Sequence, residues 1–195
     1  MPFEQFWDSK HRINSGSGLG RSTAQQYIDY FEKVGPFAED LEDAESIIDI
    51  GPGLCNFLNA YPMKERYGVD ISSVGRQKME SHGIKAYAPG QAPEEIADLA
   101  TCLSVIQHCT ADQVEAILFD IATALKPGGV FYANGVYTGC ENADESSLLK
   151  RARFSHSLDF IREICEEYGL AITDEHPYKG HGMQIWIIRG GIYES

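Results

Sequence analysis

Two glycines beside an acidic residue form the clearest candidate ligand site in the sequence. The stretch IIDIGPGLC at residues 47–55 places Gly51 and Gly53 directly after a β-branched apolar run typical of a buried strand. A glycine has no Cβ, so the backbone can approach a bound molecule closely. Asp49, at the end of the expected strand, is placed to accept a hydrogen bond or to orient the loop. The stretch predicts a ligand-binding turn, with an ordinary strand-to-helix turn as the simpler alternative.

The spacing of the glycines argues against a dinucleotide. The pyrophosphate fingerprint G-x-G-x-x-G, counted from Gly51, requires a third glycine at position 56, where the sequence has Asn56. That third glycine lets the helix pack closely against the strand. A nucleotide-dependent oxidoreductase on a related sheet is therefore disfavoured.

The segments that must position these residues alternate between strand and helix patterns. Short apolar runs rich in β-branched residues are separated by segments of helical period from residue 45 onward, a pattern typical of a parallel sheet covered by helices. The expected strands cover residues 46–50, 67–71, 84–87, 99–105, 130–133, 170–175 and 183–188. The expected helices cover residues 23–34, 54–60, 74–81, 112–125 and 158–168.

The predicted fold is an α/β, Rossmann-like, doubly wound sheet of seven strands, mostly parallel, with an antiparallel C-terminal hairpin. The hairpin is expected because Lys179-Gly180-His181-Gly182 is a short turn-rich link between the last two strands. We expect one domain over residues 1–195, with a helical lid segment at 1–44 and a ligand-binding core at 45–190.

Composition and charge exclude several classes of partner. The formal net charge of −13 would repel a nucleic-acid backbone. Five cysteines, scattered and without a C-x-x-C pair, indicate neither a disulfide framework nor a zinc site. No window is apolar over the roughly twenty residues that a membrane span needs, and the N-terminus lacks the apolar core of a signal peptide. We therefore expect a cytoplasmic protein that binds no nucleic acid and no membrane.

The glycine stretch resembles the D-x-G-x-G signature of class I S-adenosylmethionine-dependent methyltransferases. Four further segments agree in order and spacing, so that the resemblance covers roughly residues 40–190. These segments are YGVDIS at 67–72, YAPGQAP at 87–93, DLATCLSVIQHCT at 98–110 and LKPGGVFYANG at 125–135.

The resemblance implies that S-adenosylmethionine is the cofactor. It assigns Asp70 to the two ribose hydroxyls, with a helix cap shared with Ser72 and Ser73 as the alternative role. Gln91 stands where the family often has an acidic residue near the adenine amino group, which is a departure from the pattern. The cofactor-binding residues implied are Asp49, Gly51, Pro52, Gly53, Asp70, Ile71, Gln91, Ala92, Ser104 and Val105.

Catalytic and substrate residues follow less directly from the resemblance. His108 follows the fourth expected strand, where it either lies near the transferred methyl group as a base or simply packs. Trp7 and His11 are four residues apart, so a helix would place both on one face, over the substrate or against the body of the domain. Tyr137 is the third expected substrate residue, and no metal site is indicated.

The SGSGLGRS segment at residues 15–22 has two interpretations. Its composition is typical of a flexible linker, and its backbone amides with Arg21 are also suited to bind the carboxylate of the cofactor. Taken together, the sequence predicts an S-adenosylmethionine-dependent methyltransferase that acts on a small-molecule or sugar-containing acceptor at oxygen or nitrogen. The alternative is a non-catalytic S-adenosylmethionine-binding scaffold or regulatory protein.

Overall fold

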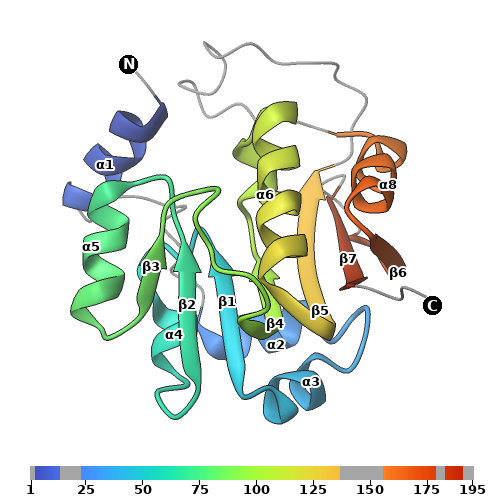
Figure 1. The fold of residues 1–195 in the computed structure, drawn as a ribbon, viewed down its shortest axis with the longest axis horizontal. Helices are drawn as coiled ribbons and strands as arrows, with labels where there is room; N and C mark the ends of the chain where they lie inside the picture. Colours follow the sequence, from blue (N-terminus) through green and yellow to red (C-terminus); the bar gives the residue numbers. More distant parts are fainter. Residues whose placement is uncertain (1–2, 14–22, 137–155, 179–182, 191–195) are drawn as a thin grey trace.

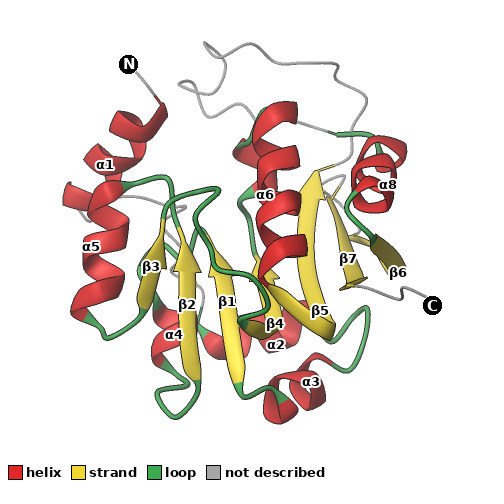
Figure 2. Cartoon of the chain, viewed as in Figure 1, coloured by secondary structure: helices red, strands yellow, loops and turns green. Residues whose placement is uncertain are grey.

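Strands and helices alternate along the chain and assemble into a twisted sheet with helices on both faces (Figures 1 and 2). The structure, a computed structural model, describes residues 3–13, 23–136, 156–178 and 183–190. The strands are β1 Ser46–Ile50, β2 Glu65–Val69, β3 Lys85–Tyr87, β4 Ala97–Cys102, β5 Leu125–Val136, β6 Leu170–Tyr178 and β7 Met183–Gly190. The helices are α1 Phe3–Ile13, α2 Ala24–Phe31, α3 Phe37–Asp43, α4 Asn56–Asn59, α5 Ser73–Ser81, the 3-10 helix η1 Ile106–His108, α6 Ala111–Ala124 and α8 Leu158–Glu167.

The order of the strands in the sheet is β3-β2-β1-β4-β5-β7-β6. The first five of these pair in parallel, which confirms the predicted α/β fold with a parallel central sheet. Strand β7 runs antiparallel to both β5 and β6. The chain moves outward from β1 through β2 to β3 and then returns to the other side of β1 as β4. The strand order therefore reverses between β1 and β4, and the loops that follow these two strands diverge and leave a crevice.

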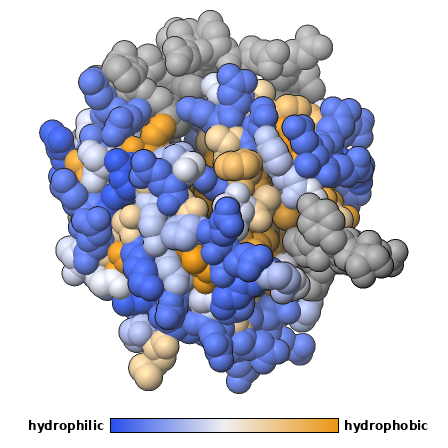
Figure 3. Space-filling model, viewed as in Figure 1, coloured by the Kyte–Doolittle hydropathy of each residue, from blue (hydrophilic) through white to orange (hydrophobic). Residues whose placement is uncertain are grey.

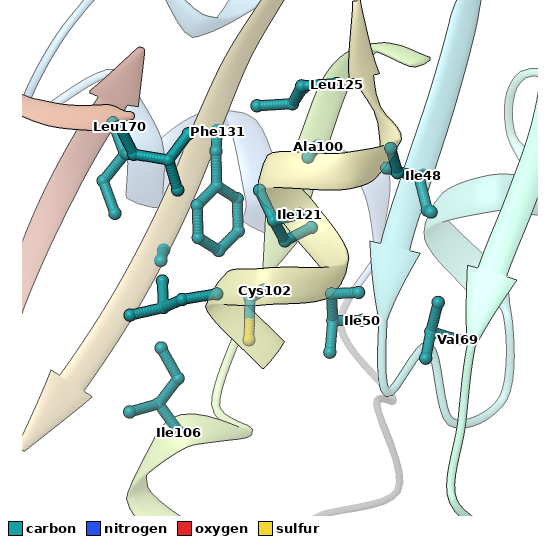
Figure 4. Close-up of a cluster of buried hydrophobic side chains, with 14 of the residues drawn as sticks. Ile48, Ile50, Val69, Ala100, Cys102, Ile106, Ile121, Leu125, Phe131 and Leu170 are labelled. Atoms are coloured by element: carbon teal, nitrogen blue, oxygen red, sulfur yellow. The ribbon is translucent and has the colours of Figure 1, made fainter. Parts of the chain in front are cut away.

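Alternate residues of the central strands supply two separate cores, one on each face of the sheet. Ile48, Ala100 and Phe131 pack with residues of α6 and α8, among them Ile121 (Figure 4). Their neighbours Ile47, Leu99 and Tyr132 pack with residues of α2, α3, α4 and α5. This period of two explains why the strand sequences are apolar almost throughout, since both faces of a parallel sheet are buried.

A polar cluster joins the amino ends of three neighbouring strands. The carboxylate of Asp98 accepts hydrogen bonds from the backbone amides of Glu45 and Ser46 and from the Ser46 hydroxyl. Lys126, at the start of β5, pairs with the same carboxylate at 3.0 Å. The cluster fixes the positions of β1, β4 and β5 relative to one another at their amino ends, opposite the crevice.

Some element boundaries differ from those expected. Strand β4 ends at Cys102 rather than at residue 105, because Ser104 has a φ of +64° and turns the chain away from the sheet. The helix expected over 54–60 is the single turn α4, since Gly53 and Cys55 also have positive φ. The helix expected over 23–34 ends at Phe31, before the Gly35-Pro36 break, and is followed by α3, which was not expected. Among the described helices, none is both long and apolar enough to cross a membrane.

Candidate functional site

A cavity of about 170 Å³ lies at the crevice between β1 and β4. Residues from the carboxyl ends of β1, β2 and β4 line its floor, among them Gly51, Asp70 and Ser104. Helix α6 forms one wall, and Trp7 and His11 of α1 line the cavity from another side. We call this space the switch-point cavity, because it lies where the strand order reverses. Over the whole face seen in Figure 3, hydrophilic residues dominate and apolar residues show in the gaps between them.

The loop after β1 owes its shape to its glycines. Gly51 and Gly53 have φ values of +65° and +56°, in the left-handed region that a side chain makes costly. The amide of Gly51 donates to the carbonyl of Val69, which holds the loop against β2. A Cβ on Gly51 would lie 2.7 Å from Cγ2 of Val105, in the loop after β4. The two loops that border the crevice can therefore approach this closely only with glycine at position 51.

Asp49 is buried beneath this loop and does not line the cavity. Its carboxylate accepts hydrogen bonds from the Tyr27 hydroxyl at 3.0 Å and the Thr101 hydroxyl at 2.8 Å. Burial raises the pKa of Asp49 to about 7, although both hydrogen bonds act in the other direction. Asp49 thus joins α2, β1 and β4 as a hydrogen-bond acceptor, and the described contacts do not place it against the cofactor space. Tyr27, which sequence analysis did not single out, stacks on Phe57 of α4 with 4.2 Å between ring centroids.

Asp70 follows β2 and lines the cavity while only 7% exposed. Its Oδ1 accepts a hydrogen bond from the amide of Ser72, and its Oδ2 lies 3.7 Å from Nε2 of His11. Burial raises the pKa of Asp70 to about 6. The helix cap considered as an alternative belongs instead to Ser72, whose hydroxyl accepts from the amide of Gly75.

The loop after β4 brings the next expected residues to the cavity. Ser104, Val105 and His108 all line it. The amide of Ser104 donates to Oδ1 of Asn134 on β5 at 2.6 Å, which holds the residue in its left-handed conformation. Such conformations cost about 1 to 3 kcal/mol and persist where the surroundings impose them, most often at functional sites.

The loop after β3 departs from the sequence-based expectation. Gln91 and Ala92 do not line the cavity, and Gln91 is exposed. Pro89 does line it, and the amide of Gly90 donates to both carboxylate oxygens of Asp120 on α6, at 2.7 and 2.9 Å. Asp120 is only 3% exposed and also lines the cavity. Burial raises the pKa of Asp120 despite the hydrogen bond from Gly90. The acidic side chain at this end of the cavity therefore comes from α6.

The periodicity of α6 could have revealed its cavity-lining face. Gln113, Ala116, Ile117 and Asp120 all line the cavity and follow the i, i+3, i+4, i+7 spacing of one helix face. Gln113 also closes a capping box with Thr110, which fixes the start of the helix beside His108. An aspartate within the otherwise apolar run AILFDIATAL was the signal available in the sequence.

The remaining expected site residues divide into three groups. Gly53 and Ile71 line the cavity, together with Trp7 and His11, which lie at different parts of it. Trp7 makes an edge contact with His108, with 5.9 Å between ring centroids, whereas His11 lies beside Asp70. Pro52 is buried in the loop and does not line the cavity. Tyr137 and the segment 15–22 lie outside the described residues.

The described residues also bear on metal binding and on catalysis by a cysteine nucleophile. Among them, no three His, Cys, Asp or Glu side chains are grouped so that they could hold a metal ion. Cys109 lines the cavity, but burial raises the pKa of its thiol to about 12. Cys109 is therefore protonated at neutral pH and is not a nucleophile there.

Comparisons with known proteins agree with this geometry. Residues 21–175 match the family described as "Methyltransferase domain". A comparison with curated proteins gives no significant match. Among solved structures, the chain is similar to magnesium protoporphyrin IX methyltransferase from Synechocystis with bound S-adenosylmethionine. The TM-score is 0.64 at 15% identity, over 96% of this chain and 95% of that chain.

Two further solved structures have the same fold. One is a Thermotoga maritima S-adenosylmethionine-dependent methyltransferase described as a possible histamine N-methyltransferase, with a TM-score of 0.61 and 16% identity over 96% of this chain and 97% of that chain. The other comes from the Haloferax volcanii complex of the Trm112 methyltransferase activator with a methyltransferase, with a TM-score of 0.61 and 15% identity over 97% of this chain and 98% of that chain. These likenesses concern the fold, whereas the family match spans most of the sequence. The chain therefore belongs to the methyltransferase-domain family and shares the fold of these methyltransferases.

Proposed function

We propose that this protein binds S-adenosylmethionine in the switch-point cavity and transfers its methyl group to an oxygen or nitrogen of a small-molecule acceptor. One observation supports the proposal above the others: the Gly51 loop, the Asp70 carboxylate and the Asp120 carboxylate converge on a single cavity at the point where the strand order reverses. We further propose that residues 1–195 act as one domain, in which α1 borders the cavity. The lid expected over 1–44 is narrowed to this helix, because α2 and α3 pack into the core with Ile47 and Leu99.

The residues of the cavity fit the nucleoside part of the cofactor. Oδ2 of Asp70 receives no hydrogen bond from the described residues, so the carboxylate can accept from ribose hydroxyls. Ile71 and Val69 offer apolar surface beside it, and Gly51 leaves the loop without a side chain that would fill the space. A buried carboxylate next to apolar walls is what a ribose joined to a flat base requires.

Asp120 is our candidate for the residue that recognises the adenine amino group. The family often has an acidic residue for this contact in the loop after β3, where this sequence has Gln91. Asp120 occupies the same end of the cavity through its bonds to the Gly90 amide. A carboxylate oxygen has more than one lone pair, so Asp120 can accept from Gly90 and from a ligand amine together. The helix thus supplies the group that the loop lacks.

When bound, S-adenosylmethionine supplies an electrophilic methyl group on a sulfonium. The chain's own task is then to align the acceptor and to exclude water. Trp7 and His108 line the cavity in contact with each other, and Cys109 and Gln113 line it beside them at the start of α6; we call this part the acceptor end. If the acceptor is a hydroxyl, His108 is placed to take its proton, whereas an amine needs alignment alone.

A small acceptor is favoured by charge. The net charge of −13 opposes binding of nucleic acid. This charge favours a metabolite, including a sugar-containing one, over a nucleic acid.

The test is a transfer assay with methyl-labelled S-adenosylmethionine and a fractionated cell extract. We expect label in the low-mass fraction and not in the RNA or protein fractions. The variant Asp70→Ala should abolish this labelling, while Asp43→Asn, at an exposed site on α3, should leave it intact. Label confined to macromolecules would overturn the small-molecule assignment, and no label in any fraction would overturn the transfer itself.

The role of His108 is tested once an acceptor is known. If the acceptor is a hydroxyl, His108→Ala should lower kcat by about a hundredfold or more and remove the acidic limb of its pH profile. An unchanged profile would show that His108 does not act as the base.

A further inference from the structure

Helix α1 is attached to the N-terminus of α5 through a single carboxylate. Asp8 accepts hydrogen bonds from the Ser72 hydroxyl at 2.6 Å, the Ser73 hydroxyl at 3.1 Å and the Val74 amide at 3.3 Å. The bond from Ser72 is the largest of the effects that together lower the pKa of Asp8 below its usual value. A negative charge is also favoured at this end of a helix. Asp8 therefore fixes one turn of α1 directly beside the loop that bears Asp70.

One turn further along α1, His11 is buried without its hydrogen bonds. The residue is 8% exposed, and its Nδ1 has no partner among the described residues. Its Nε2 lies 3.7 Å from Oδ2 of Asp70, which is too long for a hydrogen bond. Both residues line the cavity, so Nε2 of His11 and Oδ2 of Asp70 form a polar pair there whose two atoms are close but not hydrogen-bonded to each other.

The first turn of α5 is shaped around this pair. A Cβ on Gly75 would lie 2.9 Å from Oδ2 of Asp70 and 3.3 Å from Nε2 of His11. Glycine is less favourable than alanine in a helix, and at this position it leaves the space that the close approach of Asp70 and His11 requires. Three elements, α1, α5 and the loop after β2, thus leave room for the two side chains to stand side by side.

The same face of α1 also contacts the acceptor end. Trp7 and His11 are four residues apart, and Asp8 lies between them in the sequence. Trp7 packs edge-on against His108 at an interplanar angle of 62°. One short helix therefore contacts Asp70 at one part of the cavity and His108 at another.

We propose that His11 is a second ribose-binding residue and that α1 links binding of the methyl donor to completion of the acceptor end. A ribose hydroxyl that donates to Oδ2 of Asp70 would also accept a hydrogen bond at its oxygen from Nε2 of His11. That contact would add to the attachment of α1 that Asp8 provides, and α1 carries the Trp7 side chain that packs against His108. This inference rests on the proposed function, because it assumes a nucleoside in the cavity. It differs from the sequence-based expectation that His11 contacts the acceptor.

The first test measures the ribose contact with two ligands and two proteins. Adenosine and 2′,3′-dideoxyadenosine are titrated calorimetrically into the wild-type protein and into His11→Phe, which keeps a ring but no hydrogen-bonding atoms. We expect His11→Phe to weaken adenosine binding about tenfold and binding of the dideoxy ligand by less than about twofold. His82→Phe, at an exposed histidine after α5, is the matched control and should change neither.

An equal loss for both ligands would mean that His11 only packs, and no loss would mean that it has no role in binding; either result overturns the proposal. His11→Gln, which retains a hydrogen-bonding side chain, should recover part of the adenosine affinity. Binding of S-adenosylhomocysteine, the demethylated cofactor, by the wild-type protein is measured alongside. If it fails to bind, the proposed function itself is wrong; if it binds and the His11 variants match the wild type, only this inference is wrong.

The second test follows the link to the acceptor end. Incorporation of 5-fluorotryptophan at Trp7 and Trp186, the two tryptophans of the chain, gives two fluorine NMR signals, and Trp7→Phe identifies the one from Trp7. We expect adenosine to shift and sharpen the Trp7 signal in the wild-type protein, and to do neither in His11→Phe saturated with adenosine. An identical response in both proteins would show that α1 does not transmit donor binding through His11.

Discussion

Burial determines the acid strength of the carboxyl groups in and beside the cavity. It raises the pKa of Asp49 to about 7 and that of Asp70 to about 6, and it also raises the pKa of Asp120. Asp98, in the same sheet, has a lowered pKa instead. Burial also acts to raise its pKa, but hydrogen bonds from Ser46 and Lys126 outweigh that effect and the pKa is lowered. The cavity carboxylates have fewer donors than Asp98, and a ligand can supply the missing ones.

Asp70 should make cofactor binding depend on pH. Only its deprotonated form can accept hydrogen bonds with both oxygens, so affinity for S-adenosylhomocysteine should rise as the pH increases through about 6. Below that pH we expect a loss of up to about tenfold per unit. Calorimetric titrations between pH 5 and 7.5 measure this. Asp70→Asn should bind more weakly and with a flat profile; a slope that persists in Asp70→Asn would assign the titration to another group, such as His11.

Asp120 should select adenine over hypoxanthine. Asp120→Asn retains an oxygen for the Gly90 amide but loses the charge that an amino group prefers. We expect about tenfold weaker binding of S-adenosylhomocysteine and no loss for S-inosylhomocysteine, whose base has an oxygen in place of the amine. Competition assays with the two ligands measure the ratio. Asp112→Asn, exposed on the same helix, is the control. A ratio equal to that of the wild type would remove Asp120 from base recognition.

Site residues at strand ends could be predicted from the sequence, whereas those placed by packing could not. Gly51, Gly53 and Asp70 follow strands whose apolar pattern is clear, so their meeting at one edge of the sheet follows from the fold alone. Asp120 reaches the cavity through the packing of α6, and Gly75 lies against the Asp70 carboxylate through the packing of α5. No helix lies between β3 and β4 in the described structure, and α6 fills the space beside that loop. The residues next to Gln91 in the sequence could not reveal that α6 packs beside this loop.

At the level of elements, the junction of α1 and α5 has the most direct consequence for binding. Gly75→Ala would favour the helix by up to about 1 kcal/mol but would press a Cβ against the Asp70 carboxylate. We therefore expect less than about 1 kcal/mol of change in unfolding free energy and about tenfold weaker binding of S-adenosylhomocysteine. Urea unfolding and calorimetry separate the two effects. Gln77→Ala, exposed on α5, should leave binding unchanged; unaltered affinity in Gly75→Ala would show that the close approach has no functional role.

Element boundaries were predicted well where breakers are strong and poorly where the backbone takes unusual angles. The Pro127-Gly128-Gly129 sequence correctly indicated the end of α6, which stops at Ala124. The left-handed conformations of Cys55 and Ser104 could not be foreseen, because neither residue type favours them. Helix α3 was missed because its sequence FAEDLED is short and has little apolar periodicity.

For the whole molecule, the parallel core follows from the sequence because both faces of each central strand are apolar. The strand order is a separate feature of the fold, and it places the loops that follow β1 and β4 beside the crevice. The expected segments 170–175 and 183–188 lie within β6 and β7, which pair antiparallel over longer ranges. Lengths at this edge of the sheet depend on pairing with β5, a contact remote in sequence.

Buried Asp49 should make the stability of the whole protein fall as the pH rises. Its pKa is raised on folding, so the folded state binds a proton more tightly, and stability is lost between the unfolded pKa near 3.8 and the folded pKa near 7. Urea unfolding at pH 5 and pH 7 should show a fall of about 2 kcal/mol from this group. Asp49→Asn should remove most of that fall, whereas Asp43→Asn should not. A pH dependence unchanged in Asp49→Asn would mean that the carboxyl does not take up a proton on folding in the way described.

The central claim is that the switch-point cavity binds the methyl donor through the Gly51 loop and Asp70. Calorimetric titration of S-adenosylhomocysteine into the wild-type protein and into Asp70→Ala tests it most directly. The account predicts binding of one ligand per chain, weakened at least about tenfold in Asp70→Ala, with no competition from reduced nicotinamide dinucleotide. Absence of binding to the wild-type protein, or equal affinity in the variant, would contradict it.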